Sequence, residues 1–115
     1  MKYILMDYVG EAGWPELTRD EQIHWLSAYK AYMEAMVKAG VLKDSKGLQP
    51  TMAATTVRVR SDKTQVLDGP YADSKEQLGG YYLIDVPDLD SAMTWAGRCP
   101  GVQHGTVEVR AIWAM

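Results

Sequence analysis

One long helix with a clear beginning and a clear end constrains the fold of this chain more than any other feature. Thr18 and Glu21 have the spacing of a capping box, in which each side chain accepts a hydrogen bond from the other residue's backbone. Helical periodicity continues to about Ala39, and Gly40 supplies the left-handed conformation that ends many helices. A long amphipathic helix needs a second layer of structure to cover its apolar stripe.

The helix presents three different sides. Its apolar stripe, with Tyr29 near the centre, consists of Trp25, Leu26, Tyr29, Tyr32, Met33, Met36 and Val37. The solvated side places Glu34 within pairing distance of Lys30 and Lys38. The remaining side is small and weakly polar, and it is either plain surface or a place where another element approaches closely: His24, Ala28, Ala31 and Ala35.

Strand signals surround this helix and a second, shorter one. The second helix follows Asp88, an N-cap candidate, buries Leu89, Ala92, Met93 and Ala96, and ends at residues 99–101. We expect strands over residues 3–9, 55–60, 64–67, 81–86 and 106–113, with 55–60 and 64–67 forming a hairpin. Residues 43–47 read as a turn-rich loop. A second capping box at residues 74–77 predicts a short helical turn that residues 78–80 end.

This order predicts an α+β domain with the ferredoxin-like split βαβ plan and an added hairpin strand. Both helices must bury their stripes on one face of a single sheet. The other face carries a mixture that includes Arg58, Glu108 and Arg110. An open sheet face often finds a partner, so we expect a homodimer.

Composition bounds the function classes. A chain of 115 residues, 47% of them hydrophobic, is one domain over residues 1–115 with a real core. The net charge of −3 does not favour a nucleic-acid or membrane-surface binder, and a single cysteine suits a reducing compartment. No apolar stretch is long enough to span a membrane, and Asp7 ends the first apolar run too early for a secretory signal. We therefore expect a cytoplasmic protein, and we find no cofactor motif and no metal-binding spacing.

Several motifs together resemble the DGPF branch of the YCII-related family. They are Asp68-Gly69-Pro70-Tyr71, residues 75–82 (KEQLGGYY) and Ile84-Asp85-Val86. Further segments extend the similarity over nearly the whole chain, and Tyr71 stands where the name-giving Phe occurs. The resemblance implies a dimeric α+β barrel, in which two ferredoxin-like sheets face each other.

The resemblance implies less about activity. Some YCII relatives look like small-molecule enzymes with a His on the first helix and an Asp just before the Pro that follows the second helix. Those positions correspond to Tyr29 and Cys99 here, so a dehydrochlorinase-type mechanism is not carried over. DGPF members are often encoded beside extracytoplasmic-function sigma factors, which implies a regulatory context.

Two candidates belong to the space between the first helix and the sheet. Tyr29 is either a pocket donor or a core tyrosine bonded to backbone. Cys99 follows a helix C-terminus, where the dipole disfavours a thiolate, so burial as a small hydrophobe is its usual role. His24 and His104 need the fold to bring Asp7 or Asp85 near them before they form a base.

The segment from Asp68 to Gly80 is either a set of turns or a functional loop. Lys75 and Glu76 suit a polar ligand or a partner chain, and Arg58 suits a paired charge lattice or an anion site. The candidate ligand-binding residues are Tyr29, Asp68, Lys75, Glu76, Tyr82, Cys99 and Arg58.

Two functions remain open at this point. The first is a small-molecule-binding domain or enzyme with its pocket between the first helix and the sheet. The second is a non-catalytic regulatory module that binds a protein such as a sigma factor. The sequence does not decide whether the chain is an enzyme.

Overall fold

A computed structural model describes residues 1–10 and 13–114. The elements, in chain order, are β1 (Lys2–Gly10), α1 (Gly13–Glu16), α2 (Arg19–Lys38), β2 (Leu42–Gly47), the 3-10 turn η1 (Thr51–Ala53), β3 (Thr55–Arg60), β4 (Lys63–Asp68), β5 (Glu76–Asp85), α3 (Leu89–Arg98), the 3-10 turn η2 (Pro100–Gln103) and β6 (Thr106–Ala111).

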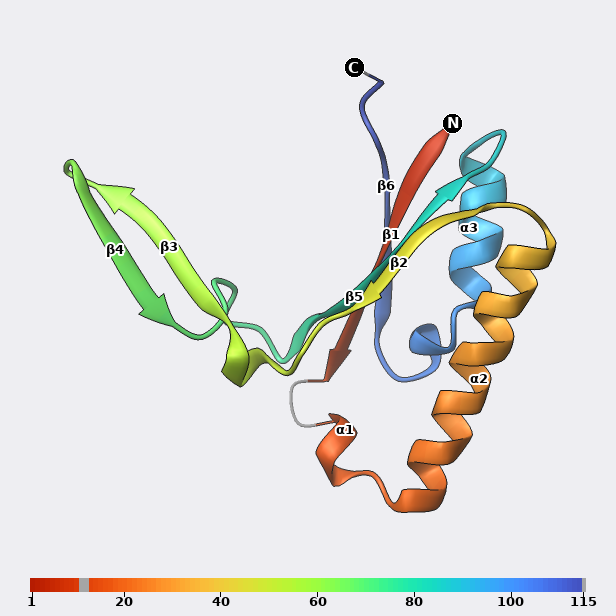
Figure 1. The fold of residues 1–115 in the computed structure, drawn as a ribbon, viewed down its shortest axis with the longest axis horizontal. Helices are drawn as coiled ribbons and strands as arrows, with labels where there is room; N and C mark the ends of the chain where they lie inside the picture. Colours follow the sequence, from red (N-terminus) through yellow and green to blue (C-terminus); the bar gives the residue numbers. More distant parts are fainter. Residues whose placement is uncertain (11–12, 115) are drawn as a thin grey trace.

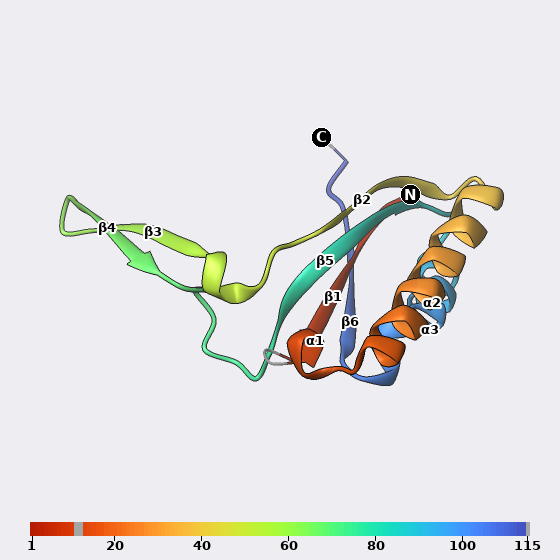
Figure 2. The same ribbon diagram turned by 60° about the horizontal axis from the view of Figure 1, so that its bottom comes forward.

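Four strands form one antiparallel sheet in the order β2-β5-β1-β6, and α2 and α3 lie together on one side of it (Figures 1 and 2). This is the strand order of the ferredoxin-like plan, so the predicted α+β fold is confirmed. The hairpin differs from expectation. β3 and β4 pair only with each other and form a separate two-stranded sheet rather than adding to the main one.

The predicted helix ends are confirmed. The Thr18 hydroxyl accepts a hydrogen bond from the Glu21 backbone N–H at 3.1 Å, and the Glu21 carboxylate accepts one from the Thr18 N–H at 2.9 Å. Gly40 has a φ of +73°, the left-handed value that favours glycine. At α3, the Asp88 carboxylate accepts from the Ser91 N–H at 2.8 Å.

The buried side of each helix is narrower than the sequence predicts. In α2 the buried residues are Tyr32 and Met36, and in α3 they are Ala92 and Ala96. Outlying members of both stripes remain exposed: Leu26, Val37, Leu89 and Met93. The helices therefore touch the sheet along one edge of their apolar stripes, and the other edge is left open.

Two local predictions are wrong, and both fail because sheet pairing overrides local sequence. Residues 43–47 belong to β2, an edge strand that pairs with β5 although its sequence is polar. The second capping box forms no helix: the Ser74 hydroxyl accepts from the Glu76 N–H at 3.3 Å, and the chain then runs as one strand through Gly79 and Gly80. Pairing with β1 and β2 on both sides keeps β5 extended.

Alternation along β1 gives the sheet two different faces. Tyr3, Leu5 and Asp7 are buried beneath the helices, in a core that also contains Ile84, Val86 and Cys99. The alternate residues of β1 and their cross-strand partners on β5 are half-buried and lie on the other side of the sheet. We call this side the open face, and its residues are Ile4, Met6, Tyr8, Tyr81 and Leu83. No helix in the described part of the chain is long and apolar enough to cross a membrane.

Candidate functional site

A buried carboxylate lies at the centre of the candidate site. Asp7 occupies the third covered position of β1 and is only 6% exposed. The Tyr29 hydroxyl, which α2 brings over the sheet, donates a hydrogen bond to Asp7 Oδ2 at 2.8 Å. The other oxygen, Asp7 Oδ1, is buried and has no hydrogen-bond partner among the described residues. A buried acceptor without a donor is costly, so this oxygen favours a proton, a water molecule or a ligand.

The surroundings of Asp7 favour its protonated form. Burial raises the pKa of the Asp7 carboxyl above its usual value, although the Tyr29 hydrogen bond and the nearby His104 oppose that rise. Burial also raises the pKa of Tyr29, and the hydrogen bond to Asp7 adds to the effect. Tyr29 therefore stays a neutral hydroxyl, while Asp7 holds its proton to a higher pH than an exposed aspartate does.

Gly101 forms the wall behind the carboxylate. It lies in η2, directly after α3, and a Cβ atom at this position would overlap Asp7 Oδ1. Only a glycine backbone approaches the carboxylate this closely, and it contributes no side-chain donor. Gly101 thus leaves no room for a side chain next to Asp7 Oδ1.

Cys99, Tyr32 and Tyr82 complete the buried cluster. Cys99 is 1% exposed, and burial raises the pKa of its thiol to about 12, although the Gly101 N–H lowers it. Tyr32 donates to the Trp95 carbonyl at 2.8 Å, and its ring meets the Tyr82 ring edge-on with centroids 5.2 Å apart. A thiol in this environment is a packed side chain and not a nucleophile at neutral pH.

An open hollow of about 630 Å³ follows the exposed side of α2. It is lined by Leu26, Tyr29, Lys30, Met33, Glu34, Val37 and Lys38. We call it the α2 hollow. Its walls are mostly apolar, and Tyr29 is the one lining residue that also bonds to Asp7. Tyr29 thus connects a surface accessible to solvent with the buried carboxyl group.

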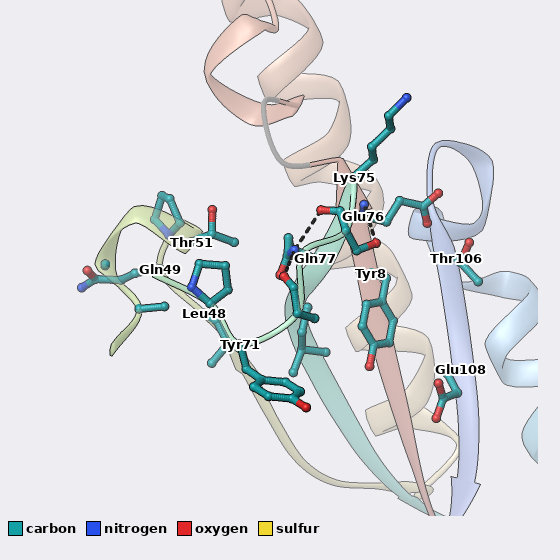
Figure 3. Close-up of a pocket in the computed structure, with 17 residues that line it drawn as sticks. Tyr8, Leu48, Gln49, Thr51, Tyr71, Lys75, Glu76, Gln77, Thr106 and Glu108 are labelled. Atoms are coloured by element: carbon teal, nitrogen blue, oxygen red, sulfur yellow. Dashed lines mark hydrogen bonds between the residues drawn. The ribbon is translucent and has the colours of Figure 1, made fainter. Parts of the chain in front are cut away.

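A second depression, of about 990 Å³, lies on the open face, and we call it the open-face groove. Its walls come from residues 48–54 and 70–78, which flank β3 and β4, and its floor includes Tyr8 and Glu108 (Figure 3). Lys75 and Glu76 are among the lining residues, and the Lys75 side chain extends away from Tyr71 and Tyr8 (Figure 3).

The structure therefore divides the predicted site residues among three places. Tyr29, Tyr82 and Cys99 lie together beneath the helices. Lys75 and Glu76 line the groove on the opposite face, without the helix N-terminus that the capping pattern predicted there.

Asp68 and Arg58 lie in the β3–β4 hairpin. Asp68 ends β4, where it pairs with Thr55, and the Arg58 side chain donates to Gln65 at 2.7 Å. The expectation that Arg58 shares a sheet face with Arg110 and Glu108 is wrong, because β3 lies outside the main sheet. Arg110 and Glu108 do pair with each other, at 2.6 Å.

The two histidines occupy the same end of α2. The Trp25 ring contacts the rings of both His24 and His104, with centroids 5.0 and 4.6 Å apart. His104 is close enough to Asp7 to lower the pKa of that carboxyl. Within the described residues, no group of three acidic, histidine or cysteine side chains is arranged to hold a metal ion.

From the sequence, Asp7 marks the end of an apolar run and is not among the candidate site residues. A usable signal was present, because the strand alternation puts residue 7 on the same face as Tyr3 and Leu5. A charged residue at a covered position needs a hydrogen-bond partner, and the Tyr29 hydroxyl needs one too. The two requirements together point to a contact between Asp7 and Tyr29.

Comparison with known proteins identifies the family. The model of the YCII-related domain matches residues 1–115. The chain is also 38% identical over 114 residues to an uncharacterized protein of Rhizobium meliloti (strain 1021), an alignment that covers 97% of this chain and 92% of that protein. Both findings extend over almost the full length, so the chain belongs to the YCII-related family.

Proposed function

We propose that this chain binds a small molecule in the α2 hollow and that the Asp7–Tyr29 pair recognises a polar group of that molecule. One observation carries the proposal: a buried carboxyl with one oxygen held by Tyr29 and the other without a partner among the described residues. Such an arrangement costs stability, and perturbed carboxyls of this kind concentrate at functional sites.

The chemistry available to the pair is proton exchange. A protonated Asp7 carries its proton on a carboxyl oxygen, and the Tyr29 hydroxyl both donates and accepts hydrogen bonds. A ligand group beside Tyr29 can receive the Tyr29 proton while Asp7 passes its own proton to the Tyr29 oxygen, which leaves a neutral hydroxyl and a carboxylate. In the reverse transfer the ligand gives a proton to the Tyr29 oxygen, and Tyr29 donates its own proton to Asp7 Oδ2. This is the behaviour of a general acid–base pair, and no other reacting side chain is required.

The lining of the hollow indicates the shape of the ligand. Leu26, Met33 and Val37 offer an apolar wall, and Lys30 and Lys38 lie at its margin. A mostly apolar molecule with one polar group directed at Tyr29 and an acidic group near a lysine fits these features. The alternative of a regulatory module that binds a sigma factor rests on the family resemblance alone.

A matched set of variants tests the proposal. The wild-type chain is screened against metabolites by thermal shift, and hits are measured by titration calorimetry. We expect micromolar binding that Tyr29→Phe and Asp7→Asn weaken at least about tenfold, the effect of losing one buried hydrogen bond.

Tyr81→Phe is the control, because Tyr81 makes a similar hydrogen bond, to Asp44, on the open face. The proposal fails if no ligand binds in the micromolar range. It also fails if Tyr29→Phe and Tyr81→Phe change the affinity of a ligand equally.

A further inference from the structure

A third hollow, of about 420 Å³, lies where η2 meets α2, and we call it the η2 hollow. It is lined by His24, Trp25, Ala28, Ala31, Tyr32, Arg98, Pro100 and Gln103. η2 leads from the end of α3 to β6 and lies beside α2 (Figure 1). The η2 hollow shares no lining residue with the α2 hollow, so two sides of one helix offer two separate surfaces.

The small side of α2 forms part of this wall. The sequence left open whether that side is plain surface or a place where another element approaches closely. The structure places Ala28 and Ala31 in the lining, together with the buried Pro100 of η2. Short side chains leave room above the helix backbone, so the small side helps to form a hollow beside η2.

The charges around the η2 hollow favour an anion. Acidic residues outnumber basic ones in the whole chain, 15 to 12. The α2 hollow nevertheless includes Glu34 and the open-face groove includes Glu76 and Glu108, whereas none of the described residues that line the η2 hollow is an aspartate or a glutamate. Arg98 therefore brings a positive charge to a wall that has no carboxylate to neutralise it.

Arg98 is oriented by one contact and keeps its hydrogen-bond donors available. Its guanidinium lies over the Trp95 ring, 4.3 Å from the ring centroid. Its charge is close enough to Tyr32 to oppose the rise in the pKa of that hydroxyl. Among the described residues Arg98 makes no hydrogen bond and no ion pair, whereas Arg110 pairs with Glu108. A planar guanidinium matches two oxygens of a carboxylate or a phosphate, so stacking on Trp95 prepares this fork for a ligand.

The other lining residues suit the rest of such a ligand. The Gln103 amide has two N–H donors, and the His24 imidazole keeps at least one N–H donor in either protonation state. Trp25, whose ring meets His24 edge-on, adds an aromatic surface beside the two alanines. The volume of the hollow is that of a small-molecule site.

We propose that the η2 hollow binds a small organic anion. Arg98 and Gln103 hold the oxygens of its carboxylate or phosphate group. The flat apolar body of the anion rests against Trp25 and the two alanines. This site is separate from the α2 hollow and does not depend on the function proposed above.

Three probe molecules test the proposal on the wild-type chain: benzoate, phenyl phosphate and benzamide, which has nearly the shape of benzoate but no charge. Nitrogen-15 NMR follows the Arg98 Nε–H, the Gln103 side-chain amide and the Trp25 indole N–H. We expect an anion to shift these signals saturably in the millimolar range or tighter, and benzamide to bind at least about tenfold more weakly. Tighter binding of benzoate identifies a carboxylate ligand, and tighter binding of phenyl phosphate identifies a phosphate ligand. The proposal is overturned if neither anion saturates these signals or if benzamide binds as well as benzoate.

Two pairs of variants locate the binding. Arg98→Met removes the guanidinium but keeps an unbranched side chain beside Trp95, and it should weaken binding of the anion at least about tenfold. Arg110→Met removes the same charge from β6, outside the lining, and should leave binding unchanged. Ala31→Leu fills the hollow without changing any charge and should also weaken binding, whereas Ser27→Leu adds the same side chain to α2 outside the lining.

Equal effects of the two members of either pair would contradict the proposal, and the amide spectrum of each variant shows whether it is folded. The α2 hollow contributes no residue to these tests, so the two proposals stand or fail separately.

Discussion

The two faces of the sheet carry two tyrosine–aspartate pairs that are chemically alike and physically opposite. Beneath the helices, Tyr29 donates to Asp7 at 2.8 Å, and on the open face Tyr81 donates to Asp44 at 2.9 Å. Asp7 is 6% exposed, whereas the Asp44 side chain is 44% exposed and also contacts Lys46. Burial raises the pKa of Asp7, while the hydrogen bonds from Tyr81, Ser45 and Lys46 lower the pKa of Asp44.

The comparison teaches that the hydrogen bond does not decide the protonation state. A tyrosine donor stabilises the carboxylate in both pairs, yet the two pKa values move in opposite directions. The desolvation of Asp7 outweighs its Tyr29 donor, since Oδ1 is buried and has no hydrogen-bond partner among the described residues. A test of this view changes one member of each pair and compares the results.

The largest effect is expected from the wall behind Asp7. Gly101→Ala puts a methyl group against the carboxylate and should lower the free energy of unfolding by about 3 kcal/mol, since the crowded core cannot easily relax. Gly97→Ala is the control, because it has open space in α3 and should stabilise slightly. Urea unfolding measures both. A second change, Asp7→Ala, should recover part of the loss in Gly101→Ala, and no recovery would place the strain elsewhere.

Removing each tyrosine hydroxyl should separate the two pairs. Tyr29→Phe leaves the buried Asp7 without a donor among the described residues and should cost about 2 kcal/mol in urea unfolding at neutral pH. Tyr81→Phe should produce no measurable change, because water replaces the hydroxyl beside the exposed Asp44. Equal losses in the two variants would show that burial does not distinguish the pairs.

The pH dependence of stability should have opposite signs for the two aspartates. The pKa of Asp7 is raised in the folded chain, so its contribution becomes unfavourable as pH rises above 3.8 and levels off above the raised value. The pKa of Asp44 is lowered, so its contribution is favourable above 3.8 and is lost as pH falls below it. Asp7→Asn should therefore gain relative to wild type with rising pH, and Asp44→Asn should lose.

Unfolding curves at several pH values measure these slopes, and carboxyl carbon NMR follows each group directly. The Asp7 resonance should titrate above 3.8 and the Asp44 resonance below it. Two midpoints on the same side of 3.8 would contradict the assignment.

The smallest effect concerns Cys99. Its thiol lies in the covered cluster with a pKa raised to about 12, so a disulfide reagent should leave it unmodified in the folded chain and react fully in urea. Rapid reaction of the folded chain at neutral pH would mean that solvent reaches the covered side of the sheet. It would contradict the view that burial distinguishes Asp7 from Asp44.

The fold could be predicted where local signals and the sheet agree. Thr18 and Asp88 act as helix caps in sequence and in structure, and the alternation of residues 55–60 correctly indicates a strand. Ser74 has the same kind of capping pattern as Thr18, but the following residues pair with β1 and remain extended. A pattern of four residues cannot reveal which distant strand lies beside it.

The site could be predicted only in part, for the same reason. Tyr29 is singled out by its position on the helix, and the sequence indicates that its hydroxyl needs a partner. That partner is Asp7, 22 residues away on β1. Burial of Asp7 also depends on Gly101 from the far end of the chain. These three positions meet only in the folded chain, so no spacing rule connects them.

The β3–β4 hairpin, residues 54–69, forms an arm with a closed base, so the length of the arm can vary without a change in the rest of the domain (Figure 1). The chain leaves and re-enters the body of the protein through residues joined by one hydrogen bond, Ala54 and Gly69. Insertions or deletions between them leave the main sheet untouched, provided that they add or remove one residue on each strand and preserve the cross-strand register. Each added pair lengthens the arm by about 3.4 Å. Arm length is thus a property that evolution can adjust independently of the residues around Asp7.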